Sequence, residues 1–429
     1  MRKLMIVLSL LGLLISIPAF AQMEGTCNID PPMDPVDINF IGWSFPIADF
    51  NAGEVENCGD VDNITVNISL LSSGDVLEQV PLALSGGGDS PYEILHASNG
   101  QVGGWGGNGW LMPLNDLVEK YWDEYDLGDI PEAVWDGGRY GDIIYGIPTS
   151  GNTLHLIYRS DVLEEMGMDV PGTYGEILEF CDAVGLDNMD WDAPFAIDLS
   201  RPRGWELEFF MVLGAYGGTY LGEGNMPAFH GPEGVAAVEL MVEVYNRCMG
   251  DAATMMTNNG METGMQQGTL PMTKLWASRA AVMTAETTDL VDVIDFAPAP
   301  SVEEGGPLAS SIWSDFYFIP ANVTADPDLI FRIIMEALDV SSQQEAAKIG
   351  IPARDSAAGF GGPYLPASNA TAAGGVGNYD KNPAVNIVIA KLSDFLPLTA
   401  TGELSPQEAL DAAADAYIEE ATAQGYIEG

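Results

Sequence analysis

The sequence predicts an α/β fold built from two lobes. Stretches with the apolar patterns of β-strands alternate with stretches of helical periodicity, which favours largely parallel sheets covered by helices. The chain has 429 residues, enough for two or three domains, and 47% of them are hydrophobic, enough for sizeable cores. Residues 149–153 form a short polar segment between two expected strands. Its small side chains indicate a place where the chain crosses from one lobe to the other.

The first 21 residues have the pattern of a secretory signal peptide. Two basic residues, Arg2 and Lys3, precede an apolar core at 4–17 and a small-x-small cleavage site at 19–21. No cysteine follows this site directly, so we expect no lipid anchor there. The sequence therefore predicts a protein that is exported to the periplasm and begins at Gln22.

Acidic residues greatly outnumber basic ones. There are 63 Asp and Glu against 15 Lys and Arg, a net charge of −48. Without the two bases of the signal segment, the mature chain has 13 bases against 63 acids and a charge of −50. Nucleic acid needs Lys and Arg at its phosphates, so we expect no nucleic-acid partner. The acids are spread along the whole chain, which favours a solvated surface suited to salty water over a site for a cationic ligand.

Three strands are expected in the first 100 residues. Val36–Trp43 alternates in polarity, and residues 63–71 and 92–95 also have strand patterns. The helix between the first two strands should be short, because Gly53 and Gly59 interrupt it.

Gly104, Gly106 and Gly109 have the spacing of a dinucleotide-binding loop. However, the run leads into Trp110 rather than directly into a helix, and export argues against a tightly held NAD. We therefore expect a flexible loop here, and no cofactor.

Between residues 109 and 167 the pattern changes several times. The expected elements are a turn around Pro113, a helix at 115–125, strands at 143–147 and 154–158, and a helix at 161–166 capped by Ser160. The first of these strands ends in Gly and Pro, as a strand does where it stops at an exposed edge.

This stretch resembles the bacterial extracellular solute-binding proteins of ABC importers, in particular the carbohydrate-binding family that includes maltose-binding protein. Members have a G-x-L-x-P-L-x-x-L turn, a Y-G-I-P strand end, and an apolar strand ending in Tyr before a helix with a D-[VL]-L-x-x-x-G ending. All three motifs stand here in order, at residues 109–117, 145–148 and 154–167.

The resemblance implies the type II periplasmic binding protein fold, with two α/β lobes joined by a three-segment hinge and the ligand cleft between them. After a signal peptide at 1–21, it implies an N-lobe of residues 22–150 and 311–350. The C-lobe then comprises residues 151–310 and 351–429.

Motifs along the rest of the chain match the same family. Residues 171–176 have its P-x-T-x-x-E pattern, in which Thr173 begins a capping box, and residues 350–354 match its third crossing. A second capping box is expected at Ser405. A Gly-x-Trp that members often show after the segment matching 275–283 is missing here.

The chain contains four cysteines, Cys27, Cys58, Cys181 and Cys248. An even number in an exported chain suggests disulfides, and four cysteines allow three pairings. We favour Cys27–Cys58 and Cys181–Cys248, because each pair then lies within one lobe. The absence of a C-x-x-C spacing argues against a zinc site.

The resemblance also suggests which residues face the ligand. In family members the residues just after the first strand line the cleft. An aromatic ring at the start of the helix that matches 203–213 also lies in the cleft. A sugar has apolar ring faces and many hydroxyls, so its site needs aromatic rings beside polar side chains. The candidate rings are Trp43, Trp205 and Trp313, and the candidate polar groups are Ser44, Ser98, Asn99, Asn152, Glu206 and Asp315.

These features predict the monomeric substrate-binding component of an ABC importer, which captures a mono- or oligosaccharide and delivers it to a membrane permease. No nucleophile elbow, H-E-x-x-H or P-loop is present, so we do not expect an enzyme. The loop with Asp187, Asp190 and Asp192 lacks the Gly and terminal Glu of an EF-hand, so we expect no metal. Two alternatives remain open. One is the same fold binding a polyamine or other cationic solute, and the other is a secreted glycan-active enzyme.

Overall fold

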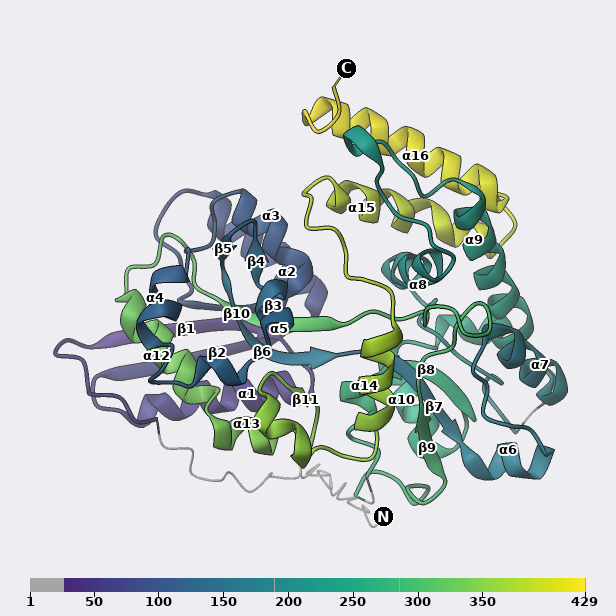
Figure 1. The fold of residues 1–429 in the computed structure, drawn as a ribbon, viewed down its shortest axis with the longest axis horizontal. Helices are drawn as coiled ribbons and strands as arrows, with labels where there is room; N and C mark the ends of the chain where they lie inside the picture. Colours follow the sequence, from purple (N-terminus) through teal and green to yellow (C-terminus); the bar gives the residue numbers. More distant parts are fainter. Residues whose placement is uncertain (1–26, 189, 285, 429) are drawn as a thin grey trace, which may run out of the picture.

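The computed structural model describes residues 27–188, 190–284 and 286–428 (Figure 1). The signal peptide expected at 1–21 lies outside these residues. The described chain forms two lobes, each built on its own sheet, and strands β6 (Gly146–Asn152) and β10 (Trp313–Phe318) lie where the lobes meet. Among the helices of the described residues, none combines the length and the apolar character that crossing a membrane requires.

The first lobe is built on a six-stranded sheet with the strand order β11-β6-β10-β3-β1-β2. Its remaining strands are β1 (Val36–Trp43), β2 (Ile64–Leu71), β3 (Ile94–Ser98) and β11 (Ile351–Pro352). Apolar side chains pack on both faces, with helices over each. A small hairpin of β4 (Arg139–Tyr140) and β5 (Ile143–Ile144) lies beside helix α3 (Val102–Gly107). The helices of this lobe are α1 (Pro46–Asn57), α2 (Ser73–Ser85), α3, α4 (Asn115–Tyr121), α5 (Glu132–Gly137), α12 (Pro327–Ala337) and α13 (Val340–Ala346).

The second lobe is built on a three-stranded sheet in the order β8-β7-β9. The strands are β7 (Leu154–Arg159), β8 (Met272–Trp276) and β9 (Ile294–Ala297). One large apolar core joins this sheet to its helices. These helices are α6 (Ser160–Met166), α7 (Tyr174–Val184), α8 (Pro202–Ala215), α9 (Pro232–Val244), α10 (Asn258–Gln267), α11 (Ala277–Ala280), α14 (Leu365–Gly374), α15 (Val385–Phe395) and α16 (Pro406–Ala423).

The expectation of largely parallel sheets is wrong. Strand β1 is parallel to β2 and β3, but β10 is antiparallel to β3 and β6, and β11 is antiparallel to β6. In the second lobe β7 is antiparallel to both of its neighbours. Parallel neighbours need a crossover connection on the same sheet, whereas strands that arrive from the other lobe do not.

Two segments that contain glycine form helices where the sequence analysis expected an interruption or a loop. Helix α1 continues through Gly53, where an added Cβ would meet nothing within 4 Å, so the predicted interruption there is wrong. Residues 102–107 form helix α3 rather than the expected flexible loop. A Cβ on Gly103 would lie 2.2 Å from the Lys381 carbonyl oxygen, and one on Gly106 would lie 2.9 Å from the Tyr145 ring. These glycines serve close packing rather than flexibility.

The polar segment 149–153 continues strand β6 and leads directly into β7 of the second sheet. Ser160 does not cap α6 as expected, since its hydroxyl donates to the Val293 carbonyl oxygen at 3.1 Å and the residue before it makes no side-chain cap. The capping boxes expected at Thr173 and Ser405 are both present.

Two disulfides lie against the hydrophobic cores of the lobes. Cys27 is bonded to Cys58 at the end of α1, and Cys181 on α7 is bonded to Cys248 in the π-helical turn η5 (Tyr245–Met249). These are the two pairs favoured from the sequence, and each closes a loop within one lobe.

Candidate functional site

The candidate site lies where β10 enters the first sheet between β3 and β6. In this register Asp315 lies opposite Ser98 on β3 and Ser150 on β6, and Trp313 lies opposite Asn152. The backbone pairing therefore brings together four candidate residues that come from three distant segments of the sequence.

Asp315 is a buried carboxyl. The residue is 7% exposed. Burial raises the pKa of the carboxyl to about 7, and a hydrogen bond with the Trp43 side chain opposes this rise. Among the described residues, no basic group contributes to its pKa. A carboxyl in this state is able both to accept hydrogen bonds and, when protonated, to donate one.

Aromatic rings gather around Trp313. Its ring centroid lies 5.0 Å from that of Tyr379 and 6.3 Å from those of Phe210 and Trp276. The Tyr379 and Phe210 centroids are 4.1 Å apart. The Trp313 residue is 8% exposed, and its buried indole N–H has no hydrogen-bond partner among the described residues. The cluster thus combines an apolar surface with an unused donor.

Glu206 lies fully buried near the start of α8. Its carboxylate accepts hydrogen bonds from the Tyr379 hydroxyl at 2.9 Å and the Tyr220 hydroxyl at 2.5 Å, and it forms an ion pair with Arg203. Arg203 also donates to the Tyr379 hydroxyl at 3.0 Å. Because these partners already use its oxygens, Glu206 acts here by fixing the Tyr379 ring.

The two candidate asparagines differ in their hydrogen bonds. Asn152 Nδ2 donates to Ser278 Oγ at 3.1 Å, and its Oδ1 accepts from the Ser278 backbone N–H at 3.2 Å. Asn99 follows β3 in the 3₁₀ turn η2 (Asn99–Gln101), and its buried Oδ1 has no partner among the described residues. Asn99 therefore offers a free acceptor, whereas Asn152 is held by α11.

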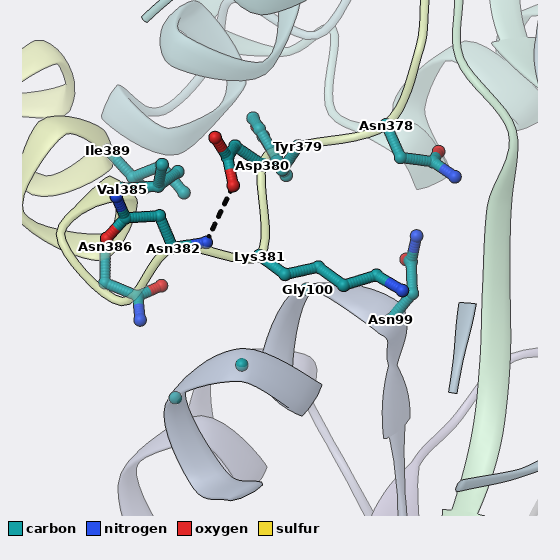
Figure 2. Close-up of a pocket in the computed structure, with 12 residues that line it drawn as sticks. Asn99, Gly100, Asn378, Tyr379, Asp380, Lys381, Asn382, Val385, Asn386 and Ile389 are labelled. Atoms are coloured by element: carbon teal, nitrogen blue, oxygen red, sulfur yellow. Dashed lines mark hydrogen bonds between the residues drawn. The ribbon is translucent and has the colours of Figure 1, made fainter. Parts of the chain in front are cut away.

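Two cavities border this cluster. One of about 20 Å³ lies between η2 and α3 on the first lobe and residues 378–389 on the second, and Asn99 and Tyr379 both line it (Figure 2). The other, of about 160 Å³, lies at the crossings and is lined by Asn152, Ser314 and Ile351. Each cavity touches one residue that the sequence analysis put forward.

Trp205 does not face the site, which corrects the expected position of its ring in the cleft. It is 2% exposed, its indole N–H donates to the Leu199 carbonyl oxygen at 3.0 Å, and its ring lies 6.0 Å from that of Tyr245 in the second-lobe core. Successive residues of an α-helix point about 100° apart, so Trp205 and its neighbour Glu206 face different surroundings.

The remaining candidates lie at the ends of β1 and β3. The Trp43 ring is half-buried and lies 5.7 Å from the His96 ring. Ser44 is exposed, and its hydroxyl donates to Asp49 at 3.1 Å. Ser98 Oγ accepts a hydrogen bond from the Gly100 N–H at 3.4 Å.

Sequence reasoning missed Phe210, Tyr379, Arg203 and Ser278. Tyr379 lies in a Gly- and Asn-rich segment where the resemblance to known motifs was weakest, and Phe210 was one apolar residue in an apolar helix. The only local signal for Tyr379 and Phe210 was an aromatic ring, in a connecting segment for Tyr379 and on a helix for Phe210. Among the described residues, no group of three or more His, Cys, Asp or Glu is placed to hold a metal ion.

The chain and its fold are similar to those of known proteins. A family model described as bacterial extracellular solute-binding protein matches residues 60–331. A search of curated proteins found no significant match. Among solved structures, a ribitol-bound ABC transporter solute-binding protein from Agrobacterium radiobacter K84 aligns with a TM-score of 0.78 at 19% identity, covering 90% of this chain and 98% of that one.

Two further solved structures are similar. A maltose-bound protein of T. maritima aligns with a TM-score of 0.79 at 16% identity and covers 90% of this chain and 99% of that one. A D-mannitol-bound ABC transporter solute-binding protein from Agrobacterium vitis S4 aligns with a TM-score of 0.78 at 18% identity and covers 91% and 99%. These likenesses confirm the expected type II fold of two α/β lobes. Since the family model matches more than half of the chain, the protein belongs to the family of bacterial extracellular solute-binding proteins.

Proposed function

We propose that the protein is the substrate-binding component of an ABC importer and that it captures a sugar, either a mono- or an oligosaccharide, between its lobes. The observation that carries the proposal is the group at β10, where aromatic rings surround Trp313 beside the buried polar groups of Asp315 and Asn99. Sugars have apolar ring faces and many hydroxyls, which match such a group. The relatives with bound ribitol, maltose and D-mannitol support a polyhydroxyl ligand.

The residues of the site take different roles in this proposal. Trp313 packs on the ligand with Tyr379 and Phe210 beside it, while Asp315 and Asn99 hydrogen-bond its hydroxyls. Glu206 acts indirectly, by fixing Tyr379. Trp43, Ser44, Ser98 and Asn152 complete the site at the ends of β1, β3 and β6.

Binding closes the lobes about three crossings. We assign residues 22–150 and 311–350 to the first lobe and residues 151–310 and 351–429 to the second. The pairing of β11 with β6 supports a third crossing within a few residues of 350. A ligand that contacts both lobes stabilises the closed form, and the closed population rises with ligand concentration.

The protein acts as a monomer in the periplasm and delivers its ligand to a permease in the inner membrane. The signal-like segment at 1–21 and the extracellular family support this location. A Kd on the order of 1 μM corresponds to about −8 kcal/mol of binding free energy. The protein itself performs no catalysis in this scheme.

One observation favours a second candidate, a cationic solute such as a polyamine. Asp315 is a buried acid, no basic group in the described part of the chain affects its pKa, and the Trp43 side chain hydrogen-bonds to it. A bound ammonium group would supply the missing positive charge. We prefer the sugar, because the neighbouring Glu206 is already neutralised by Arg203 and so a second acidic anchor is not free.

A thermal-shift panel on the chain from Gln22 onward, in high salt, tests the function. The panel contains monosaccharides, alditols, maltose, maltotriose, putrescine, spermidine and amino acids. A ligand at 100 times its Kd stabilises the folded state by about 2.7 kcal/mol, which raises Tm measurably. We expect a rise with one group of sugars or alditols. A rise with the polyamines alone contradicts the sugar proposal, and turnover of a polysaccharide contradicts the transport proposal.

A matched pair of variants locates the site. Trp313→Phe removes the indole N–H and part of the ring surface, so we expect sugar binding to weaken at least tenfold. Trp122→Phe is the control, because Trp122 is 39% exposed on the first lobe outside the ring cluster. Equal affinities for both variants would place the ligand elsewhere.

A further inference from the structure

Residues 375–383, which connect α14 to α15, form a segment that we call the strap (Figure 1). The strap is anchored on the second lobe at both ends. The Val376 N–H donates to the Ser310 carbonyl oxygen at 2.8 Å, and just before the strap the Gly374 carbonyl oxygen accepts from the Leu308 N–H at 2.8 Å. At the other end, Asn382 Nδ2 donates to Asn225 Oδ1 at 2.6 Å. The strap therefore moves with the second lobe.

The middle of the strap meets the first lobe with almost no space between them. The Lys381 carbonyl oxygen lies 2.2 Å from the position that a Cβ on Gly103 would take, and the Lys381 ammonium donates to the Asp136 carbonyl oxygen on α5. Figure 2 shows the Lys381 side chain extending over Gly100 toward Asn99. The cavity left at this place, about 20 Å³, has room for about one water molecule. This end of the cleft is therefore shut by backbone against backbone.

The strap also forms part of the wall of the site. Tyr379 lies two residues before Lys381, and its ring is 5.0 Å from Trp313 and 4.1 Å from Phe210. Two residues of extended chain span at most about 7 Å. The backbone of Tyr379 therefore lies within about 7 Å of the shut end.

The lobes also meet where α1 contacts α11. Burial raises the pKa of the Asp49 carboxyl on α1, and the nearby charge of Arg279 on α11 partly opposes this rise. Arg279 is itself paired with Glu262 at 2.7 Å, so it is held in place. The two lobes are thus in contact both at the strap and between α1 and α11.

We propose that the strap, through Tyr379, Lys381 and the facing Gly103, limits the ligand to the size of one sugar ring or one acyclic sugar alcohol. This inference rests on the proposed sugar-binding function and narrows it. A chain of several sugars that extends toward Gly103 has to open the contact between the strap and the first lobe, and one that extends toward α11 has to open the contact between α11 and α1. Longer ligands therefore stabilise the closed form less than a single unit does.

Isothermal titration with ligands of increasing length tests this limit. The probes are glucose, maltose and maltotriose, each with its alditol, and the same series for any other sugar that raises Tm in the panel. We expect the single unit or its alditol to bind at least tenfold more tightly than the trisaccharide. A trisaccharide that binds as tightly as the single unit overturns the inference and leaves the sugar-binding function standing. Failure of every sugar and alditol to bind instead overturns the function.

Two matched glycine variants assign the limit to the strap. Gly103→Ala places a methyl group against the Lys381 carbonyl, so the shut end opens and the ratio of single-unit to trisaccharide affinity should fall at least threefold. Gly53→Ala, in a helix of the same lobe with open space around the glycine, should leave the ratio unchanged. A folded Gly103→Ala protein with an unchanged ratio overturns the role of the strap.

A third variant covers the possibility that Gly103→Ala does not fold. Lys381→Met keeps the aliphatic stem and removes the ammonium group that reaches Asp136. We expect its Tm to stay near that of the wild type and its preference for the single unit to weaken in the same direction. An unchanged preference in Lys381→Met also contradicts the proposal.

Discussion

Asp315 and Glu208 are two buried carboxyls with different surroundings. Glu208, 1% exposed, pairs with Lys274 at 2.6 Å, and the Lys274 ammonium also donates to the Ala309 carbonyl oxygen at 2.9 Å. Such a pair is strongly destabilised when one partner is removed, since the other is left buried and charged. Asp315 lacks this compensation, and uncompensated acids of this kind concentrate at functional sites.

We expect Asp315→Asn to stabilise the ligand-free protein at alkaline pH. The pKa of about 7 in the folded state lies above the ordinary value of 3.8. The folded protein thus keeps a proton that the unfolded chain loses, and its stability falls as the pH rises from about 4 to about 7. The shift corresponds to at most about 4 kcal/mol. Urea unfolding at pH 5 and pH 8 should show a larger gain for the variant at pH 8.

Asp37→Asn is the control for this measurement, because Asp37 is an exposed carboxyl on β1 that also loses one charge. A similar gain in both variants, or none in Asp315→Asn, contradicts the prediction. The same Asp315→Asn protein should bind its sugar at least tenfold more weakly, as expected when a hydrogen bond to a charged group is lost.

At the scale of the elements, the helix starts follow from short local motifs. Thr173 precedes α7, where its Oγ1 accepts from the Glu176 N–H at 3.2 Å and the Glu176 carboxylate accepts from the Thr173 N–H at 3.0 Å. Ser405 and Glu408 repeat this arrangement at α16. Each motif satisfies two backbone donors that the first turn of a helix leaves free.

Thr173→Ala should lower the free energy of unfolding by about 1 kcal/mol, because the cap at α7 is lost. Thr173→Ser keeps the hydroxyl and should lose much less. Urea unfolding of the two variants beside the wild type measures the difference. If the serine variant is as unstable as the alanine variant, the threonine methyl group rather than the hydroxyl carries the effect.

At the scale of the whole molecule, the net charge of −48 sets the response to salt. Like charges on a compact surface repel one another and destabilise the folded state. Raising ionic strength from 0.1 M to 1 M shortens the screening length from about 10 Å to about 3 Å. At 1 M the repulsion is significant between charged groups that lie within a few ångströms of each other.

We therefore expect Tm to rise when NaCl or KCl is raised from 0.1 M to 1 M at pH 7.5. Both salts should act alike at equal ionic strength, since screening depends on charge and concentration. Differential scanning calorimetry measures the rise, and sucrose at matched osmolality serves as the control for exclusion of cosolute from the surface. A constant Tm in salt, or an equal rise in sucrose alone, contradicts screening as the cause.

The sequence by itself determined the family, most of the strands and helices, the two capping boxes and the favoured disulfide pairs. These features depend on hydrophobic periodicity, on residues close together in the chain, or on contiguous motifs such as those at 109–117 and 145–148. The bounds of β1 and both capping boxes were therefore predicted accurately. The length of α1 was predicted wrongly, because a single glycine does not end a helix that is packed on a sheet.

Only the tertiary structure decided which side chains form the site. The Tyr379 hydroxyl donates a hydrogen bond to Glu206, which is 173 residues away in the sequence. Lys381, two residues after Tyr379, packs against Gly103 of the other lobe. The direction of Trp205 into the core was likewise decided by helix α8 as it packs in the second lobe. Contacts of this kind depend on how the two lobes pack against each other. The residue pattern of one segment does not predict which distant segment packs against it.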